Sequence, residues 1–307
     1  MAAIVPIIIP KFKERVLPLA LLQTMRPRQW TKNGFVFVAL LFDRQLFNPE
    51  SVIRTLIAFV LLCLMSSAVY ILNDMVDIEV DRRHPKKRQR PLPAGRLSPS
   101  VAGGAALVMA AGSLAAGFSM APVFGLILLA YLISQISYTL WLKHVVLIDV
   151  SIIAAGFVLR IAAGVAVISP VQRFSPWLYI FGGFLALFMA LGKRRHELVL
   201  LGADAGNHRA ILDEYSLELL DKLISIVTTS AIVAYSLYTF LAEGLPENDL
   251  MMLTIPFVLY GMFRYLYLIH VRHEGGAPEE ILLRDRPMQI ALVLGAALVF
   301  VVLYLAP

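Results

Sequence analysis

The chain has 307 residues, of which 59% are hydrophobic and only 16% are charged, and its formal net charge is +6. Soluble domains carry about a quarter charged residues, so this composition and a mean hydropathy of +0.76 exclude an ordinary soluble domain. The single cysteine, Cys63, lies inside an apolar run, which excludes a disulfide framework and gives no indication of thiol chemistry.

Apolar runs of about 20 residues recur along the chain, and a helix of that length crosses a hydrocarbon core of about 30 Å. The sequence therefore predicts an all-α polytopic membrane protein with nine transmembrane helices. In chain order these cover residues 29–47, 52–72, 101–120, 122–141, 147–168, 176–192, 222–242, 250–270 and 288–305.

Lys and Arg are concentrated in alternate connections between these spans. Cytoplasmic loops carry the excess of positive charge in membrane proteins, so we expect a cytoplasmic N-terminus and an outside C-terminus. An odd number of spans fits that split. The opposite connections hold little beyond Arg44, Arg54 and Arg173, whereas the basic groups are Lys11–Lys32, Arg82–Arg96, Lys143, Lys193–Arg209 and Arg272–Arg286.

Acidic residues gather at the cytoplasmic end of the second span. Asn73, Asp77 and Asp81 are spaced i, i+4, i+8 and would share one helix face, with Asp74 beside them. Like charges at this spacing repel, and divalent cations between the carboxylates would relieve the repulsion. An all-oxygen set with one amide suits Mg²⁺ that also binds substrate phosphates. The alternative interpretation is an ordinary solvated helix end.

A basic loop follows the acidic residues at once. His84-Pro85 breaks the helix, and the loop then carries Lys86, Lys87, Arg88, Arg90 and Arg96. Such residues can simply retain a loop in the cytoplasm. Next to a metal site, they are also what a ligand with a further phosphate requires.

Residues 73–95, which read NDxxDxxxD and then DRxHPxKxxRPxxxG, resemble the first signature of the UbiA family of intramembrane prenyltransferases. The resemblance implies nine transmembrane helices around a central cavity, with two acidic motifs facing it. It covers nearly the whole chain, so we expect one transmembrane catalytic domain, 1–307. Cytoplasmic segments at about 73–99, 193–221 and 271–287 would cap it.

The second motif of that family, DxxxD, is incomplete here. Asp149 is present, but Ile153 stands where the second carboxylate is expected. Arg160 lies 11 residues after Asp149, on nearly the same helix face, and Gly156 between them would leave room for a ligand. A charge this deep must face the bundle interior or water, so the two residues could bind substrate or pair with other helices.

These departures resemble one branch of the family, the decaprenyl-phosphate phosphoribosyltransferases of actinobacteria. That branch shows RPxQWxKN, the acidic signature, LKHxxxxDV with a later LR, and GKRRxEL, all of which occur here. The resemblance implies phosphoribosyl pyrophosphate (PRPP) as donor, decaprenyl or another polyprenyl phosphate as acceptor, and Mg²⁺. It also implies the first step toward decaprenylphosphoryl-arabinose for cell-wall arabinan, on the cytoplasmic side of the bacterial inner membrane. The partners are these substrates and the bilayer, with no nucleic acid; a homo-oligomer stays open.

The site residues follow from the motifs and from this resemblance. The expected catalytic residues are Asp77, Asp81 and Asp149, and the expected metal ligands are Asn73, Asp74, Asp77 and Asp81. The expected substrate-binding residues are Lys32, Asn33, Tyr70, Lys86, Arg88, Arg90, Tyr138, Lys143, Arg160, Lys193, Arg194, Arg195 and Glu197. Tyr215 is either a further substrate contact or part of a plain connector.

Two other functions compete with this interpretation. A conventional prenyltransferase would use an isoprenoid diphosphate donor and an aromatic or other acceptor, but it predicts a carboxylate in place of Ile153. A transporter should carry polar residues in both membrane halves and paired broken helices. Here the charge lies almost entirely on one side, apart from Arg160.

Overall fold

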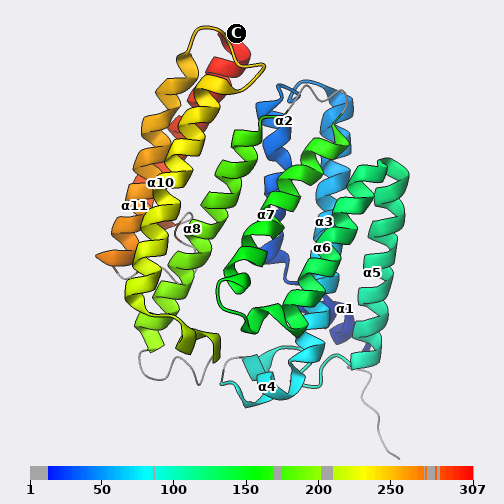
Figure 1. Ribbon diagram of the computed structural model, residues 1–307. Helices are drawn as coiled ribbons and strands as arrows, with labels where there is room; N and C mark the ends of the chain where they lie inside the picture. Colours follow the sequence, from blue (N-terminus) through cyan, green and yellow to red (C-terminus); the bar gives the residue numbers. More distant parts are fainter. Residues whose placement is uncertain are drawn as a thin grey trace, which may run out of the picture.

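The computed structural model describes residues 13–85, 87–168, 174–201, 210–272, 274, 281 and 284–306, and the regular structure in them is helical (Figure 1). Eight segments of this part are long and apolar enough to cross a bilayer, which confirms the all-helical membrane fold. They are α3 (Pro49–Val76), α5 (Pro99–Met120), α6 (Pro122–Leu140), α7 (Ile148–Val167), α8 (Pro176–Leu201), α10 (Leu217–Leu241), η6 with α11 (Leu250–Thr254, Ile255–His270) and α13 with η7 (Arg286–Phe300, Val301–Leu305).

Several long helices begin where a polar residue accepts hydrogen bonds from the first turn. The side chains of Asn48, Ser98, Ser216 and Asp285 each accept from a backbone amide two or three residues onward. Proline follows within two residues of Asn48, Ser98 and Asp285, where its missing N–H costs nothing. These caps fix where α3, α5, α10 and α13 begin.

The expected first span, 29–47, is not a regular α-helix, and nine spans are not confirmed. The segment forms a 3₁₀ helix, η1 (Pro27–Phe37), followed by the short helix α2 (Val38–Phe42). At about 2.0 Å per 3₁₀ residue and 1.5 Å per α residue, the two together reach about 30 Å, enough to cross a hydrocarbon core. η1 packs against α7 and α3.

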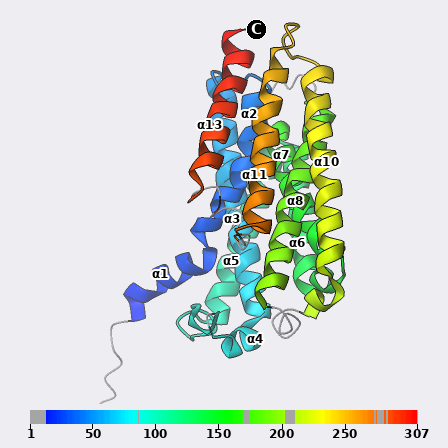
Figure 2. The ribbon, with the colours of Figure 1, turned by 90° about the vertical axis from the view of Figure 1, so that its left-hand side faces the viewer.

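The long helices run side by side as a bundle, and the shorter elements gather mainly at one end of it (Figures 1 and 2). α4 (Ile78–Arg83) lies at that end, and α1 (Lys13–Met25) projects sideways from the bundle toward it. The C-terminus lies at the opposite end. The number of crossings and the identity of the cytoplasmic face stay predictions.

Two predicted helix ends differ from the structure. α3 continues to Val76 and α8 continues to Leu201, whereas ends at 72 and 192 were expected. Both extensions carry polar residues, which apolar length cannot recognise as helical. As a result, the GKRRHEL sequence lies inside α8, and its side chains are held by a continuous helix instead of a loop.

At the end of the bundle opposite α4, Arg54 caps the C-terminal ends of two helices. Arg54 Nε donates to the carbonyl of Val167 at 2.7 Å, and its Nη2 donates to that of Met120 at 3.2 Å. These carbonyls belong to the last turns of α7 and α5, where a cation complements the helix dipole. Of the other two arginines expected on this side, Arg44 follows α2 and is among the described residues, whereas Arg173 is not.

Candidate active site

A break in the helix after Val76 arranges the acidic residues. α3 ends there, Asp77 serves as the junction, and α4 begins at Ile78. The expected single stripe is consequently divided. Asp77 pairs with Lys143, whereas Asp74 and Asp81 share Arg90.

Asp74 and Asp81 are both 1% exposed and share one arginine. Arg90 Nη1 lies 3.1 Å from Asp74 Oδ1 and 2.7 Å from Asp81 Oδ2. Asp74 Oδ1 also accepts a short hydrogen bond from Arg26, and Lys87 Nζ lies 3.5 Å from Asp81 Oδ1. Because buried carboxylates need compensating charge, these cations offset part of the cost of burying both groups.

Asp77 is the most accessible of the three carboxylates. Its Oδ1 accepts from Lys143 Nζ at 3.1 Å, and its Oδ2 accepts from Asn73 Nδ2 at 3.2 Å. Lys143 belongs to η3 (Leu142–His144), 66 residues further along the chain. The acidic signature and the LKH sequence therefore meet at one place.

The donor atoms in this region suit a hard divalent cation. They are carboxylate oxygens and one amide oxygen, and two of the carboxylates are buried. Within the described residues, however, no three acidic, His or Cys side chains already converge on a metal position. Arg90 occupies the space between Asp74 and Asp81, so a metal that uses both must displace its guanidinium.

Asp149 lies in a different, fully buried setting. It is 0% exposed, its Oδ2 accepts from Arg194 Nε at 2.8 Å, and its Oδ1 accepts from the Tyr215 hydroxyl at 2.6 Å. Arg194 Nη1 also donates to Glu197 Oε2 at 2.8 Å. Burial and the hydrogen bond to Asp149 raise the pKa of Tyr215 to about 12, so this hydroxyl stays protonated.

Ile153 belongs to an apolar environment. It packs against a buried cluster that includes Val150, Phe188, Leu191 and Tyr215. A carboxylate at this position would lose water and gain no cation from that cluster. The structure thus explains how the chain accommodates the apolar residue in place of a second acid.

Arg160 is 6% exposed and has no carboxylate partner among the described residues. Its Nε donates to Asn33 Oδ1 at 2.8 Å, Nη1 to the Gly156 carbonyl at 2.7 Å, and Nη2 to the Tyr131 hydroxyl at 3.0 Å. Its guanidinium also lies 4.9 Å from the Tyr131 ring centroid and 5.5 Å from that of Phe157. Arg160 and Asn33 thus join η1, α6 and α7 inside the bundle.

The remaining predicted substrate-binding residues differ in their exposure and in the direction of their side chains. Arg195 is directed away from the acidic cluster, because its Nε donates to Asp221 Oδ1 at 2.6 Å. Arg88 and Lys193 are exposed, and Lys32 and Tyr138 are half-buried. Lys86 lies outside the described residues.

Two further residues contact the expected acidic residues: Arg26, which was not expected in the site, and Tyr215, whose role the sequence left open. Arg26 contacts Asp74, and its guanidinium lies 4.9 Å from the ring centroid of the half-buried Tyr70. Tyr215 contacts Asp149. The RPRQW sequence could have indicated Arg26, but no local pattern marks Tyr215, whose partner is 66 residues away.

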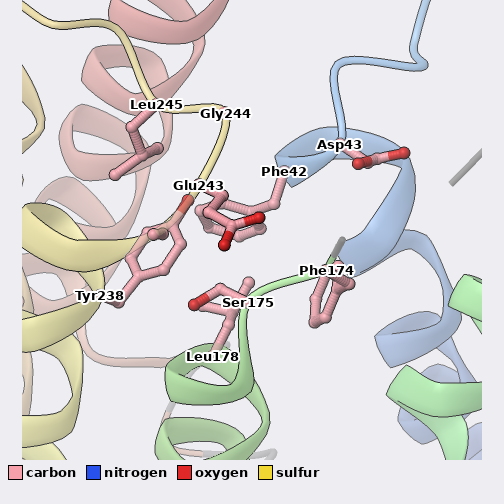
Figure 3. A pocket seen from close by; sticks show the side chains of 10 residues that line it. Phe42, Asp43, Phe174, Ser175, Leu178, Tyr238, Glu243, Gly244 and Leu245 are labelled. Atoms are coloured by element: carbon pink, nitrogen blue, oxygen red, sulfur yellow. The ribbon is translucent and has the colours of Figure 1, made fainter. Parts of the chain in front are cut away.

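The one pocket drawn in close-up lies far from this chemistry, at the end of the bundle where α2 and α10 end and α8 begins (Figure 3). Its wall includes Asp43, Ser175, Tyr238 and Glu243, and none of the acidic residues of α3 or α4 lines it. The Asp43 Oδ2 and Ser175 Oγ atoms are buried and have no hydrogen-bond partner among the described residues. We assign no part of the reaction to this pocket.

Comparison with known protein families identifies the family of this chain. The model of the UbiA prenyltransferase family matches residues 34–279. The chain belongs to that family. The family is one of integral membrane enzymes, as the eight apolar helices indicate.

Relatives in this family include proteins named decaprenyl-phosphate phosphoribosyltransferase. The protein of that name from Mycolicibacterium smegmatis is 34% identical over 91% of this chain and 92% of its own length. The one from Corynebacterium glutamicum is 31% identical over 94% of this chain and 87% of its own length. The expected resemblance to this branch is confirmed.

Among solved structures, a UbiA homologue from Archaeoglobus fulgidus bound to GPP and Mg²⁺ has the same fold. Its TM-score is 0.71 at 19% identity, over 92% of this chain and 99% of the other. Members of the family thus bind a divalent metal, and this chain places its oxygen donors on a UbiA fold.

Proposed function

We propose that this protein transfers the 5-phosphoribosyl group of PRPP to decaprenyl or another polyprenyl phosphate and releases pyrophosphate, with Mg²⁺ as the metal. The observation that carries the proposal is the second acidic position, where Asp149 pairs with Arg194 and Ile153 packs in an apolar cluster. That arrangement favours binding of an additional anion over a second metal-diphosphate motif. The relatives named decaprenyl-phosphate phosphoribosyltransferase, at 31–34% identity, support the same substrates.

The charges of the site match a donor with phosphate at both ends. Asn73, Asp74, Asp77 and Asp81 would hold Mg²⁺, which when bound neutralises charge on the diphosphate that leaves. Lys143, Lys87 and Arg88 would bind the diphosphate oxygens, together with Arg90 once it leaves the carboxylates. Lys86 and Glu197 remain proposed substrate contacts.

The other phosphates require cations outside the acidic cluster. Lys193 and Arg194 would receive the 5-phosphate of the donor. Arg26, Lys32 and Tyr70, at the opposite side of the cluster, would receive the phosphate of the lipid acceptor. Each phosphate thus meets basic side chains from a different element, which is how one site can bind two anionic substrates.

The chemistry itself needs little from the protein beyond binding and orientation. The acceptor is a phosphate monoester, which is already anionic at neutral pH, so no general base has to remove a proton. As pyrophosphate leaves, positive charge develops at C1 of the ribose, and the lipid phosphate oxygen attacks that carbon. In-line attack inverts C1, so we expect a β-linked product; recovery of an α-linked product would contradict this geometry.

We place this site on the cytoplasmic side of the bacterial inner membrane, because the acidic cluster and the basic loops share one end of the bundle. η1 with α2 would supply the ninth crossing. The whole chain would then form one catalytic domain, with its cap built from the segments around α4, η5 (Ala210–Glu214) and the region before α13.

A direct assay distinguishes this reaction from conventional prenyl transfer. Purified protein with Mg²⁺ is incubated with ribose-labelled PRPP and polyprenyl phosphate, and in parallel with a labelled prenyl diphosphate and an aromatic acceptor. We expect label in the lipid product only in the first reaction, and none after chelation of Mg²⁺. Product only in the second reaction would refute the proposal.

A further inference from the structure

We infer that Asp149 is not a metal ligand in this chain but a positioning residue that fixes Arg194 to receive the 5-phosphate of the donor. This inference rests on the proposed function. Both oxygens of Asp149 already accept hydrogen bonds from buried groups, at 2.8 Å from Arg194 and 2.6 Å from Tyr215. Asp149 is 0% exposed, and its cation partner Arg194 is itself only 2% exposed and held within α8. It therefore differs from Asp74 and Asp81, whose loop partner Arg90 is 29% exposed and can move aside for a metal ion.

The partners of Asp149 come from separate parts of the fold. Arg194 belongs to α8, and Tyr215 lies two residues before the start of α10. Tyr215 also accepts a hydrogen bond from the Leu147 backbone amide at 2.9 Å, where Leu147 has a φ of 66°. A non-glycine residue holds that conformation only where its surroundings enforce it. Asp149, Leu147 and Tyr215 therefore form one rigid junction at the start of α7.

Arg194 is immobilised by this junction. Its Nε is held by Asp149 and its Nη1 by Glu197, and it is only 2% exposed. Within the described part of the chain, Nη2 has no hydrogen-bond acceptor. A guanidinium fixed at two nitrogens presents the third in a defined direction, which suits recognition of a phosphate oxygen.

The missing second acid supports the same assignment. A metal site built on Asp149 would need another oxygen ligand one helical turn away, and Ile153 occupies that position within an apolar cluster. Among the described residues, the side chain of Asp149 thus makes hydrogen bonds only with Arg194 and Tyr215. Its loss should weaken donor binding and leave the metal requirement unchanged.

The test compares Asp149→Asn with Asp77→Asn in the full-length protein. Asparagine preserves the shape of the Asp149 side chain and can still accept from Arg194, so folding should persist. Two binding measurements are made: Mn²⁺ titration followed by electron paramagnetic resonance, and ribose 5-phosphate titration in a chelating buffer. The kcat and KM for PRPP are measured at saturating Mg²⁺.

We expect Asp149→Asn and Arg194→Lys to weaken ribose 5-phosphate binding at least tenfold and to raise the KM for PRPP more than they lower kcat. Tyr215→Phe keeps the Asp149–Arg194 pair, so its effect should be smaller, about threefold. Mn²⁺ affinity should fall in Asp77→Asn and stay within twofold of wild type in Asp149→Asn.

A loss of Mn²⁺ affinity in Asp149→Asn equal to that in Asp77→Asn would overturn the inference. Unchanged ribose 5-phosphate binding in both Asp149→Asn and Arg194→Lys would overturn it as well. A wild-type protein that binds Mn²⁺ but not ribose 5-phosphate would instead refute the proposed donor and the phosphate role of Arg194. In that case the Mn²⁺ comparison still decides whether Asp149 is a metal ligand.

Discussion

The backbone carbonyl oxygen of Val36 lies 2.0 Å from the position that a Cβ would take on Gly164. Val36 belongs to η1 and Gly164 to the last turn of α7, so the two backbones are in direct contact. Only a residue without a side chain permits this approach. The close contact explains how a narrow 3₁₀ segment fits beside α7 and delivers Asn33 to Arg160.

Gly164→Ala should therefore be strongly destabilising, because Val36 can move only with the whole of η1. We expect a loss of at least about 2 kcal/mol in the free energy of unfolding, seen as a lower melting temperature in detergent. Gly112→Ala is the matched control, since a Cβ there meets nothing within 4 Å. A melting temperature for Gly164→Ala equal to that of the control would show that η1 does not pack as described.

Arg90 and a divalent metal should compete for Asp74 and Asp81. Arg90→Ala leaves two buried carboxylates with less compensating charge, so it should cost about 2 kcal/mol of stability without metal. Because the carboxylates are then more available, Mg²⁺ should raise the melting temperature of this variant more than that of wild type. Arg88→Ala, at an exposed neighbouring position, should do neither. Equal Mg²⁺ responses in wild type and Arg90→Ala would argue against a shared position.

Asp77→Asn should abolish turnover without preventing membrane insertion. Its carboxylate is the accessible one of the three, and we expect kcat to fall at least ~100-fold because charge on the leaving diphosphate is no longer neutralised. Glu79→Gln provides the control, because Glu79 is exposed and, among the described residues, pairs with exposed Arg82 at 2.6 Å and not with the acidic cluster. Activity of Asp77→Asn near the wild-type value would remove Asp77 from the metal site.

Arg160→Met should test whether the buried arginine is mainly structural. The substitution leaves Asn33 Oδ1 without its donor and removes the side-chain donor of the Gly156 carbonyl, so we expect a loss of about 2–4 kcal/mol in the free energy of unfolding. A thermal unfolding curve measured beside the binding affinity for PRPP separates the two roles. Unchanged stability with weakened substrate binding would assign Arg160 to the substrate instead.

The stability of the protein should depend on pH through Asp43, in the loop after α2. Burial raises the pKa of Asp43 from 3.8 to about 6, so the folded state binds the proton more tightly than the unfolded state. Stability therefore falls as pH rises from about 4 to about 6.

Asp43→Asn removes the pH-dependent contribution of Asp43 to the free energy of unfolding. Because the side chain is partly solvated, the variant should gain only about 1 kcal/mol over wild type above pH 6 and match it near pH 4. Melting temperatures measured from pH 4 to pH 8 give the comparison. Parallel curves for the two proteins would mean that Asp43 does not titrate in this range.

Much of the fold could be predicted because apolar length decides where a chain crosses a membrane. The predicted spans 101–120, 122–141 and 147–168 agree with α5, α6 and α7 to within two residues. The same criterion failed for η1, whose conformation is decided by its contact with Gly164. It also ended α8 too early, because a helix leaving the hydrocarbon no longer needs apolar side chains.

For the candidate site, the sequence could predict which residues take part but not most of the pairs that they form. Spacing indicated that Asn73 and Asp77 are neighbours, and their hydrogen bond at 3.2 Å confirms this. Spacing could not indicate that Arg90 turns back onto Asp74, because long side chains in a loop have many directions available. The Asp149–Tyr215 pair depends on tertiary packing of distant segments, which no local pattern encodes.

The length of α3 has a consequence for the proposed lipid substrate. Its 28 residues extend about 42 Å at 1.5 Å each, roughly 12 Å more than the hydrocarbon core requires. The surplus carries Asn73 and Asp74, so the acidic end reaches the layer where phospholipid head groups lie. A polyprenyl phosphate already keeps its own phosphate at that depth. The hydrophobic tail could therefore stay dissolved in the bilayer throughout the reaction, while the sugar donor arrives from water.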